Sequence, residues 1–97
     1  MTTASPLMTT YPPAQVTFVR GAGTELWDDT DKRYLDFLGG LAVVSLGHAH
    51  PVVADALCAQ ARTLLHVSNL FATVPGRQVA AALDRLLGGG GKVFFAN

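Results

Sequence analysis

Three histidines are the first residues whose types and spacing suggest chemistry. His48 and His50 stand one residue apart just before Pro51, and His66 follows later in the chain. Imidazole is a common zinc ligand, but a catalytic zinc site takes about three protein ligands, and no cysteine or carboxylate lies at ligand spacing from the pair. We therefore expect no metal site, and instead a loop whose imidazoles bind backbone groups before a helix begins.

Four aspartates gather between residues 28 and 36 and raise the question of a calcium site. Their spacing lacks the glycine and the terminal glutamate of an EF-hand loop. Short Asp side chains accept hydrogen bonds from their own backbone, which favours turns. We expect a solvated polar turn over residues 28–32. The four aspartates are Asp28, Asp29, Asp31 and Asp36.

Two further features have simple structural explanations. Gly88–Gly91 precede Lys92, but a P-loop has a strand before its glycines and a helix after them, and the order expected here is the reverse. A helix-to-strand connection is predicted instead. Cys58 lies near the edge of an apolar helix face and is predicted to be a packed thiol. A single cysteine also excludes an intrachain disulfide and is typical of a reducing compartment.

The overall composition narrows the class of protein. The 97 residues are 49% hydrophobic and 14% charged, which is typical of a globular chain rather than a disordered tail. Seven basic residues balance seven acidic ones, so no electrostatic footprint for nucleic acid is present. No apolar run approaches the roughly 20 residues that span a bilayer, and a secretory signal is not recognisable. We expect a cytoplasmic protein that binds neither nucleic acid nor membrane.

The elements that must position these residues begin after an N-terminal arm, residues 1–15, which lacks a core of its own. Alternating and β-branched residues predict strands over 16–20, 24–27 and 34–37. Polar turns would join them into a small antiparallel β-meander. Residues 38–46 are apolar but interrupted by two glycines, which indicates an irregular buried segment.

Two helices are predicted to follow. Pro51 suits a first helical turn, where its missing N–H costs nothing, and apolar residues recur at helical spacing from there to Leu65. A second helix is expected from Pro75 to Leu87, and the glycines after it favour its termination.

The last residues carry a different pattern. Val93–Ala96 is a continuous apolar run, which is typical of a strand buried on both faces in a parallel sheet. Such a strand needs partners for its N–H and C=O groups, and none follows. The predicted fold class is therefore α/β, with a small antiparallel meander, two helices and the first strand of a larger parallel sheet. The chain is expected to be a truncated piece.

Seven short motifs follow one another along the chain: Phe18–Gly21, Leu26–Asp28, Lys32–Phe37, Gly40–Val43, Leu46–Pro51, His66–Phe71 and Val93–Asn97. In this order they resemble the opening of class III aminotransferases, most closely the acetylornithine aminotransferases. The resemblance covers about residues 16–97. One departure lies in the second turn, where the family usually has Asp-Gly-Lys and this chain has Asp31 followed directly by Lys32.

This resemblance implies a fold-type I enzyme that forms a homodimer with active sites at the subunit interface. Pyridoxal 5'-phosphate would be held on a lysine and act as an electron sink. An amino group would pass from N-acetylornithine, or a similar ω-amino donor, to 2-oxoglutarate in arginine biosynthesis. Ornithine, succinylornithine, 4-aminobutyrate and diaminopelargonate aminotransferases share much of this opening. Residues 16–74 would be a small-domain segment, and residues 75–97 the start of the large cofactor-binding domain.

The resemblance assigns no catalytic or cofactor-binding residue to this chain, which is predicted to be inactive by itself. The family's phosphate-binding Ser-Gly-Ala/Thr-Glu segment would follow Asn97, and the cofactor lysine lies further on. Lys32 and Lys92 do not stand in the cofactor-lysine context. The segment 40–43 matches a family stretch that lines the substrate entrance, and the segment 68–71 matches one close to the dimer interface. Four residues are predicted to line the substrate site, with ordinary core or interface packing as the alternative for each: Leu41, Val43, Asn69 and Phe71.

Two other functions stay open at this point. One is a stand-alone binding or dimerisation module that reuses the aminotransferase opening, and the other is a small metal protein built on the three histidines. A stand-alone module must bury its own core and unfold cooperatively. A fragment would instead expose the apolar run 93–96 and tend to aggregate.

Overall fold

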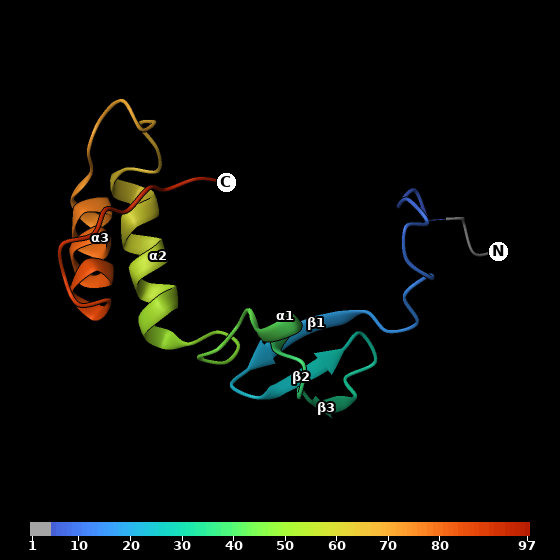
Figure 1. Ribbon diagram of the computed structural model, residues 1–97. Coiled ribbons are helices and arrows are strands. Elements are labelled where there is room, and N and C mark those ends of the chain that lie inside the picture. Colours follow the sequence, from blue (N-terminus) through green and yellow to red (C-terminus); the bar gives the residue numbers. More distant parts are fainter. Residues whose placement is uncertain (1–4) are drawn as a thin grey trace. The chain divides into compact units, whose positions relative to one another are not determined.

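A computed structural model describes residues 5–97 (Figure 1). The chain divides into two compact units, one that ends at Cys58 and one that spans Ala59–Asn97. The first unit holds the predicted meander, and the second holds the C-terminal helix and the apolar run after it.

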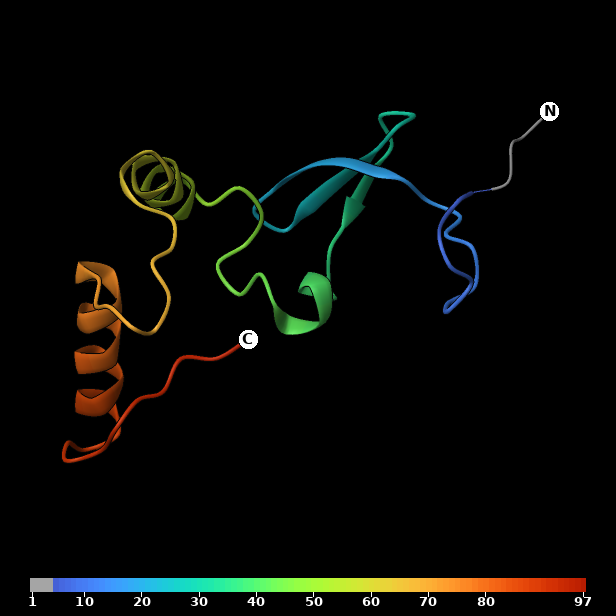
Figure 2. The ribbon, with the colours of Figure 1, turned by 90° about the horizontal axis from the view of Figure 1, so that it is seen from above.

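A three-stranded antiparallel sheet forms the centre of the first unit. Its strands β1 (Phe18–Ala22), β2 (Glu25–Asp28) and β3 (Arg33–Leu35) lie side by side in sequence order (Figure 2). The predicted meander is therefore confirmed. The first strand begins later than expected, and a bulge interrupts its pairing between Phe18 and Arg20.

Side-chain pairs across the strands stabilise this sheet. The Phe18 and Tyr34 rings meet edge to face with their centroids 5.2 Å apart. The Arg20 guanidinium lies 3.8 Å from the centroid of the Trp27 ring, the residue opposite it in the ladder. Aromatic and cation–π pairs of this kind stabilise a small sheet without a buried core.

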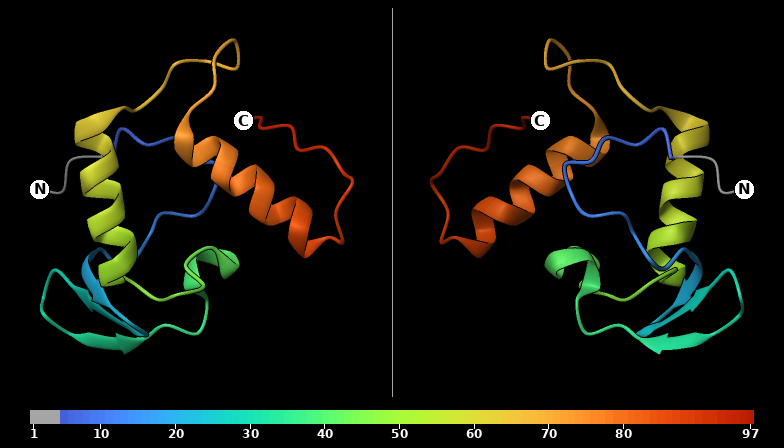
Figure 3. Two further views of the ribbon diagram at one scale, coloured as in Figure 1. Left: turned by 90° about the vertical axis from the view of Figure 1, so that its left-hand side faces the viewer. Right: turned by 90° about the vertical axis from the view of Figure 1, so that its right-hand side faces the viewer.

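The short element α1 (Gly39–Ala42) follows β3 (Figure 3). Its backbone angles are unusual. All four of its residues have positive φ, with 60° and 68° at the two glycines, 65° at Leu41 and 61° at Ala42. Backbone bonds of helical spacing close it, from Ala42 to Leu38 and from Val43 to Gly39. It is a turn of left-handed helix, which costs about 1–2 kcal/mol for each residue other than glycine.

Two longer helices complete the structure. Helix α2 (Pro51–Thr63) begins at Pro51 as predicted. Helix α3 (Val74–Leu86) begins one residue before the expected Pro75, because the Thr73 hydroxyl accepts a hydrogen bond from the Gly76 N–H at 3.2 Å and caps the helix. None of the helices among residues 5–97 is long and apolar enough to cross a membrane.

After α3 the chain reverses direction through a glycine turn (Figure 2). Gly88, Gly89 and Gly90 all have positive φ, and the Asp84 carboxylate accepts the Gly91 N–H at 2.7 Å. The segment 92–97 that follows forms no strand within the described chain. A strand is defined by its ladder partners, and the described residues offer none to this segment.

Burial differs from the prediction. Among residues 5–97 no apolar side chain is buried. The segment 38–46, expected to be buried, has Leu41 77% and Val43 75% exposed. Cys58, expected to be packed, is exposed.

Candidate functional site

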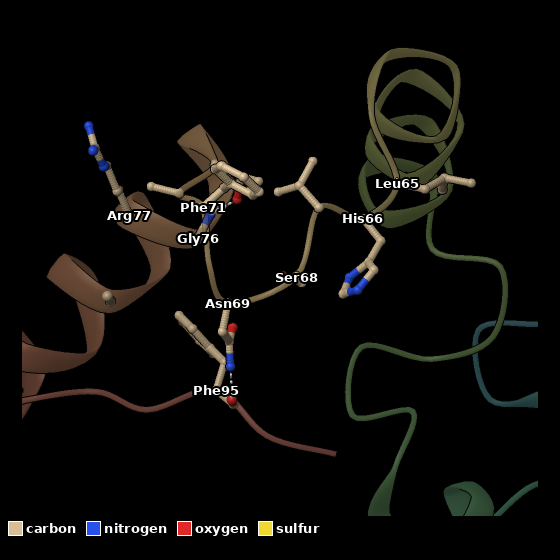
Figure 4. A pocket seen from close by; sticks show the side chains of 12 residues that line it. Leu65, His66, Ser68, Asn69, Phe71, Gly76, Arg77 and Phe95 are labelled. Carbon is tan, nitrogen blue, oxygen red and sulfur yellow. Dashed lines mark hydrogen bonds between the residues drawn. The ribbon is translucent and has the colours of Figure 1, made fainter.

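Two of the four predicted substrate-lining residues, Asn69 and Phe71, line one hollow in the second unit (Figure 4). The hollow has a volume of about 340 Å³ and lies between the loop after α2, the first turns of α3 and the segment 92–97. Its other lining residues are Leu65, His66, Val67, Ser68, Ala72, Thr73, Gly76, Arg77, Ala80 and Phe95.

The Asn69 amide connects the two sides of this hollow. Its Nδ2 donates a hydrogen bond to the Phe95 carbonyl at 3.0 Å, as the dashed line in Figure 4 shows. The neighbouring Ser68 has a φ of 67°, and its hydroxyl accepts the Leu70 N–H at 3.1 Å. This tight turn holds Asn69 toward Phe95, so Asn69 ties the loop to the C-terminal segment as well as lining the hollow.

The groups around the hollow can bind a small molecule. They include hydroxyl, amide and imidazole groups from Ser68, Asn69 and His66, beside the apolar rings of Phe71 and Phe95. No carboxylate or lysine is among them, and the Arg77 guanidinium points away from Asn69 (Figure 4). The set lacks a paired acid and base, so it fits recognition rather than a chemical step.

The other two predicted residues, Leu41 and Val43, belong to the first unit. Val43 lines a separate hollow of about 390 Å³ with His50, Val53 and Leu57 among its walls. Leu41 lines neither hollow and extends from the left-handed turn α1.

Within residues 5–97 the side chains of His48 and His50 do not bind backbone groups, although such contacts were predicted for them. His48 Nε2 lies 2.6 Å from Asp36 Oδ2, so this imidazole binds a carboxylate rather than a backbone group. The pKa of Asp36 is lowered, first by the Gly39 N–H, then by the His48 side chain and the Leu38 N–H. His50 Nδ1 is buried and has no hydrogen-bond partner among the described residues. The Asp36–His48 contact is not apparent from the sequence, because the two residues are twelve positions apart along the chain.

Asp28 also differs from the prediction of a solvated turn. Among residues 5–97 it is the one polar residue that is buried, with an exposed fraction of 7%. Its carboxylate accepts hydrogen bonds from the Thr30 hydroxyl at 2.7 Å, the Lys32 N–H at 2.9 Å and the Tyr34 hydroxyl at 2.9 Å. The Thr30 hydroxyl is the largest cause that lowers its pKa, to about 2, although burial opposes the shift. The Asp28-x-Thr30 spacing signals the turn, but only the folded sheet brings Tyr34 to it.

The described residues do not form a pyridoxal phosphate site. The cofactor needs a lysine amine for its Schiff base. Lys32 lies with its Nζ 5.0 Å from the Tyr34 ring centroid, and neither it nor Lys92 lines either hollow. Within residues 5–97 there is also no group of three or more His, Cys, Asp or Glu side chains that could hold a metal ion.

Comparison with known families decides what this chain is. The sequence signature of the family described as aminotransferase class-III matches residues 8–97, nearly the whole chain. The chain belongs to the class III aminotransferase family. The family predicted from the seven motifs is confirmed, and so is the fold class, because solved class III aminotransferases contain the same arrangement of sheet and helices.

A curated relative and two solved structures show how far this likeness extends. The acetylornithine aminotransferase of Streptomyces coelicolor is 50% identical over 91 residues, which are 94% of this chain and 23% of the relative. The crystal structure of N-acetylornithine aminotransferase from Stenotrophomonas maltophilia matches with a TM-score of 0.82 at 36% identity, covering 92% of this chain and 24% of its own.

The ornithine aminotransferase of Toxoplasma gondii, described as having partial occupancy of PLP at its active site, matches with a TM-score of 0.80 at 31% identity. It covers 86% of this chain and 20% of its own. The chain therefore spans about a quarter of the length of the class III aminotransferases it matches.

Proposed function

We propose that the whole protein carrying this chain is a pyridoxal-phosphate-dependent aminotransferase of the cytoplasm. It transfers an amino group from N-acetylornithine, or a similar ω-amino donor, to 2-oxoglutarate in arginine biosynthesis. The observation that carries this proposal is the family match over residues 8–97, together with a relative at 50% identity that is named acetylornithine aminotransferase.

The proposal also assigns three segments of the chain to parts of the whole enzyme. Residues 1–15 form an N-terminal arm, residues 16–74 a small-domain segment, and residues 75–97 the start of the cofactor-binding domain. Leu41 and Val43 line the substrate site at its entrance, and Asn69 and Phe71 line it close to the interface of a homodimer. The 97 residues contain no suitable lysine and are inactive by themselves, which agrees with a hollow that offers recognition groups but no acid–base pair.

The test begins with the DNA beyond the codon for Asn97. An open frame that continues with Ser-Gly-Ala/Thr-Glu, and later encodes a lysine, supports the proposal. The protein encoded by the whole frame is then purified and examined for the visible absorbance of a lysine-bound cofactor. A stop codon directly after Asn97 would contradict the catalytic part of the proposal.

The amino donor is tested by measuring glutamate formed from 2-oxoglutarate. N-acetylornithine is compared with ornithine, succinylornithine and 4-aminobutyrate at equal concentration. We expect the largest kcat/KM with N-acetylornithine, because kcat/KM reports differential binding of the transition state. A larger value for 4-aminobutyrate would move the protein to another branch of the family, and no glutamate from any donor would overturn the activity itself.

A stand-alone binding or dimerisation module is the alternative function. Such a module has to bury its own core. In residues 5–97 no apolar side chain is buried, so this observation favours the aminotransferase over the module.

A further inference from the structure

The left-handed turn α1 is held by one carboxylate. Asp36 Oδ1 accepts hydrogen bonds from the Leu38 N–H and the Gly39 N–H, each at 2.9 Å, at the point where the turn begins. The Asp36 N–H donates to the Thr24 carbonyl at 2.7 Å, which anchors this residue to the β1–β2 hairpin. The Asp36 side chain itself is 9% exposed, and its bond to the Gly39 N–H is partly buried.

His48 binds the other oxygen of the Asp36 carboxylate, and we call Asp36 and His48 together the clamp. Its Nε2 lies 2.6 Å from Asp36 Oδ2, and its backbone exchanges two hydrogen bonds with Gly23, of 2.8 and 2.9 Å. The other ion pairs of this unit join Arg20 to Asp31 and Arg33 to Glu25. His48 is therefore the one basic side chain that contacts Asp36 in the described part of the chain.

The backbone of the turn next to this clamp is strained. Leu41 and Ala42 adopt a backbone that L-residues avoid, and Leu41 is an apolar side chain left 77% exposed by it. Strained residues persist only where surrounding contacts overdetermine them, and they concentrate at functional sites. In a relaxed right-handed turn the Leu41 side chain would point in a different direction. The clamp, which holds the turn left-handed, therefore determines the direction of the Leu41 side chain.

We propose that Asp36 and His48 are positioning residues: they hold Gly39–Ala42 left-handed and thereby present Leu41 to an apolar part of the substrate. The identity of the molecule that Leu41 contacts rests on the proposed function. The left-handed turn and its dependence on the clamp do not.

The backbone part of the proposal is tested by NMR on the protein that carries this chain, labelled at leucine, alanine, phenylalanine and tyrosine. The intraresidue HN–Hα NOE and coupling report the sign of φ at Leu41 and Ala42. Positive φ is expected in the unaltered chain and in Asp55→Ala, a matched control on the exposed surface of α2. In Asp36→Ala and in His48→Ala, φ at both residues is expected to become negative, while the Phe18–Tyr34 ring contact reports an intact sheet.

A rescue variant separates positioning from folding of the sheet. Glycine adopts positive φ without strain, so Asp36→Ala combined with Ala42→Gly is expected to restore positive φ at Leu41. The proposal is overturned if the unaltered chain shows negative φ at Leu41 and Ala42, or if both single variants keep positive φ. It is also overturned if the single variants lose the sheet and Ala42→Gly restores nothing, since Asp36 would then serve the sheet alone.

The substrate part is tested by kinetics on the protein that carries the chain. We expect Asp36→Ala to raise the KM of the amino donor about tenfold and to change kcat by less than about twofold, with recovery of KM in the variant that also has Ala42→Gly. An unchanged KM with the NMR result as expected would overturn the contact between Leu41 and substrate. Absence of any aminotransferase activity in the unaltered protein would overturn the proposed function, and the NMR result would still decide the clamp.

Discussion

At the scale of single residues, Asp28 organises the turn between β2 and β3. Three of its partners follow it within six residues, and together they hold its pKa at about 2, below the ordinary value of 3.8. A lowered pKa means that the ionised form stabilises the folded turn. This stabilisation is complete above the ordinary pKa and is lost as the pH falls from about 5 towards 2.

We therefore expect the sheet to loosen in acid because Asp28 becomes protonated. The Tyr34 ring signals, followed by NMR through an acid titration, measure this change. In Asp28→Asn the amide does not titrate, so the signals are expected to resemble the acid form already at neutral pH. Asp29→Asn, in the same turn but exposed, is the control. Identical titrations of the Asp28→Asn variant and the unaltered chain would contradict this role.

Gly21 is a second residue whose type matters. A Cβ at this position would lie 2.8 Å from Cβ and Cγ of His48, a distance that ordinary contacts do not reach. We expect Gly21→Ala to displace the His48 ring and lengthen its contact with Asp36, without changing any charge. The displacement is measured as a shift of the His48 ring signals. Gly23→Ala is the steric comparison, since a Cβ there meets nothing within 4 Å, although its φ of 57° adds backbone strain.

At the scale of elements, helix α3 depends on its cap. The Thr73 hydroxyl accepts the Gly76 N–H, and removing such a cap costs about 1 kcal/mol. We expect Thr73→Ala to speed amide exchange in the first turns of α3 about fivefold, the factor that corresponds to this free energy. Thr63→Ala is the control, because its hydroxyl bonds the Ala59 carbonyl within α2 and caps no N-terminus. Equal exchange in both variants would show that the cap contributes nothing.

The elements that were predicted well are those decided by local pattern. Alternation placed the strands of the meander, and Pro51 placed the start of α2. The run 93–96 was predicted as a strand from its apolar composition, but it has no ladder partner in the described chain. The left-handed form of α1 was also missed. Gly39 and Gly40 signal irregular backbone, but Leu41 and Ala42 carry no signal for positive φ.

At the scale of the whole molecule, residues 5–97 have no buried apolar core, and this determines how the chain is expected to unfold. Side chains such as Phe37 and Phe94 are 95% and 83% exposed. Cooperative unfolding requires burial that is shared by the whole chain. We expect broad, non-cooperative unfolding of the 97 residues in urea, together with binding of a hydrophobic dye at neutral pH. A single sharp transition with coincident fluorescence and circular dichroism would contradict this expectation.

The sequence by itself determined the family, the meander and the two long helices, because these depend on residue order and on periodicities of two and 3.6 along the chain. Asn69 and Phe71 line one hollow, and their contact with substrate stays a prediction. Only the tertiary structure decided that Asp28 is buried, that His48 binds Asp36 rather than a backbone group, and that α1 is left-handed. These features depend on contacts between strand, turn and loop, and such contacts are specified by the folded arrangement rather than by any local stretch of residues.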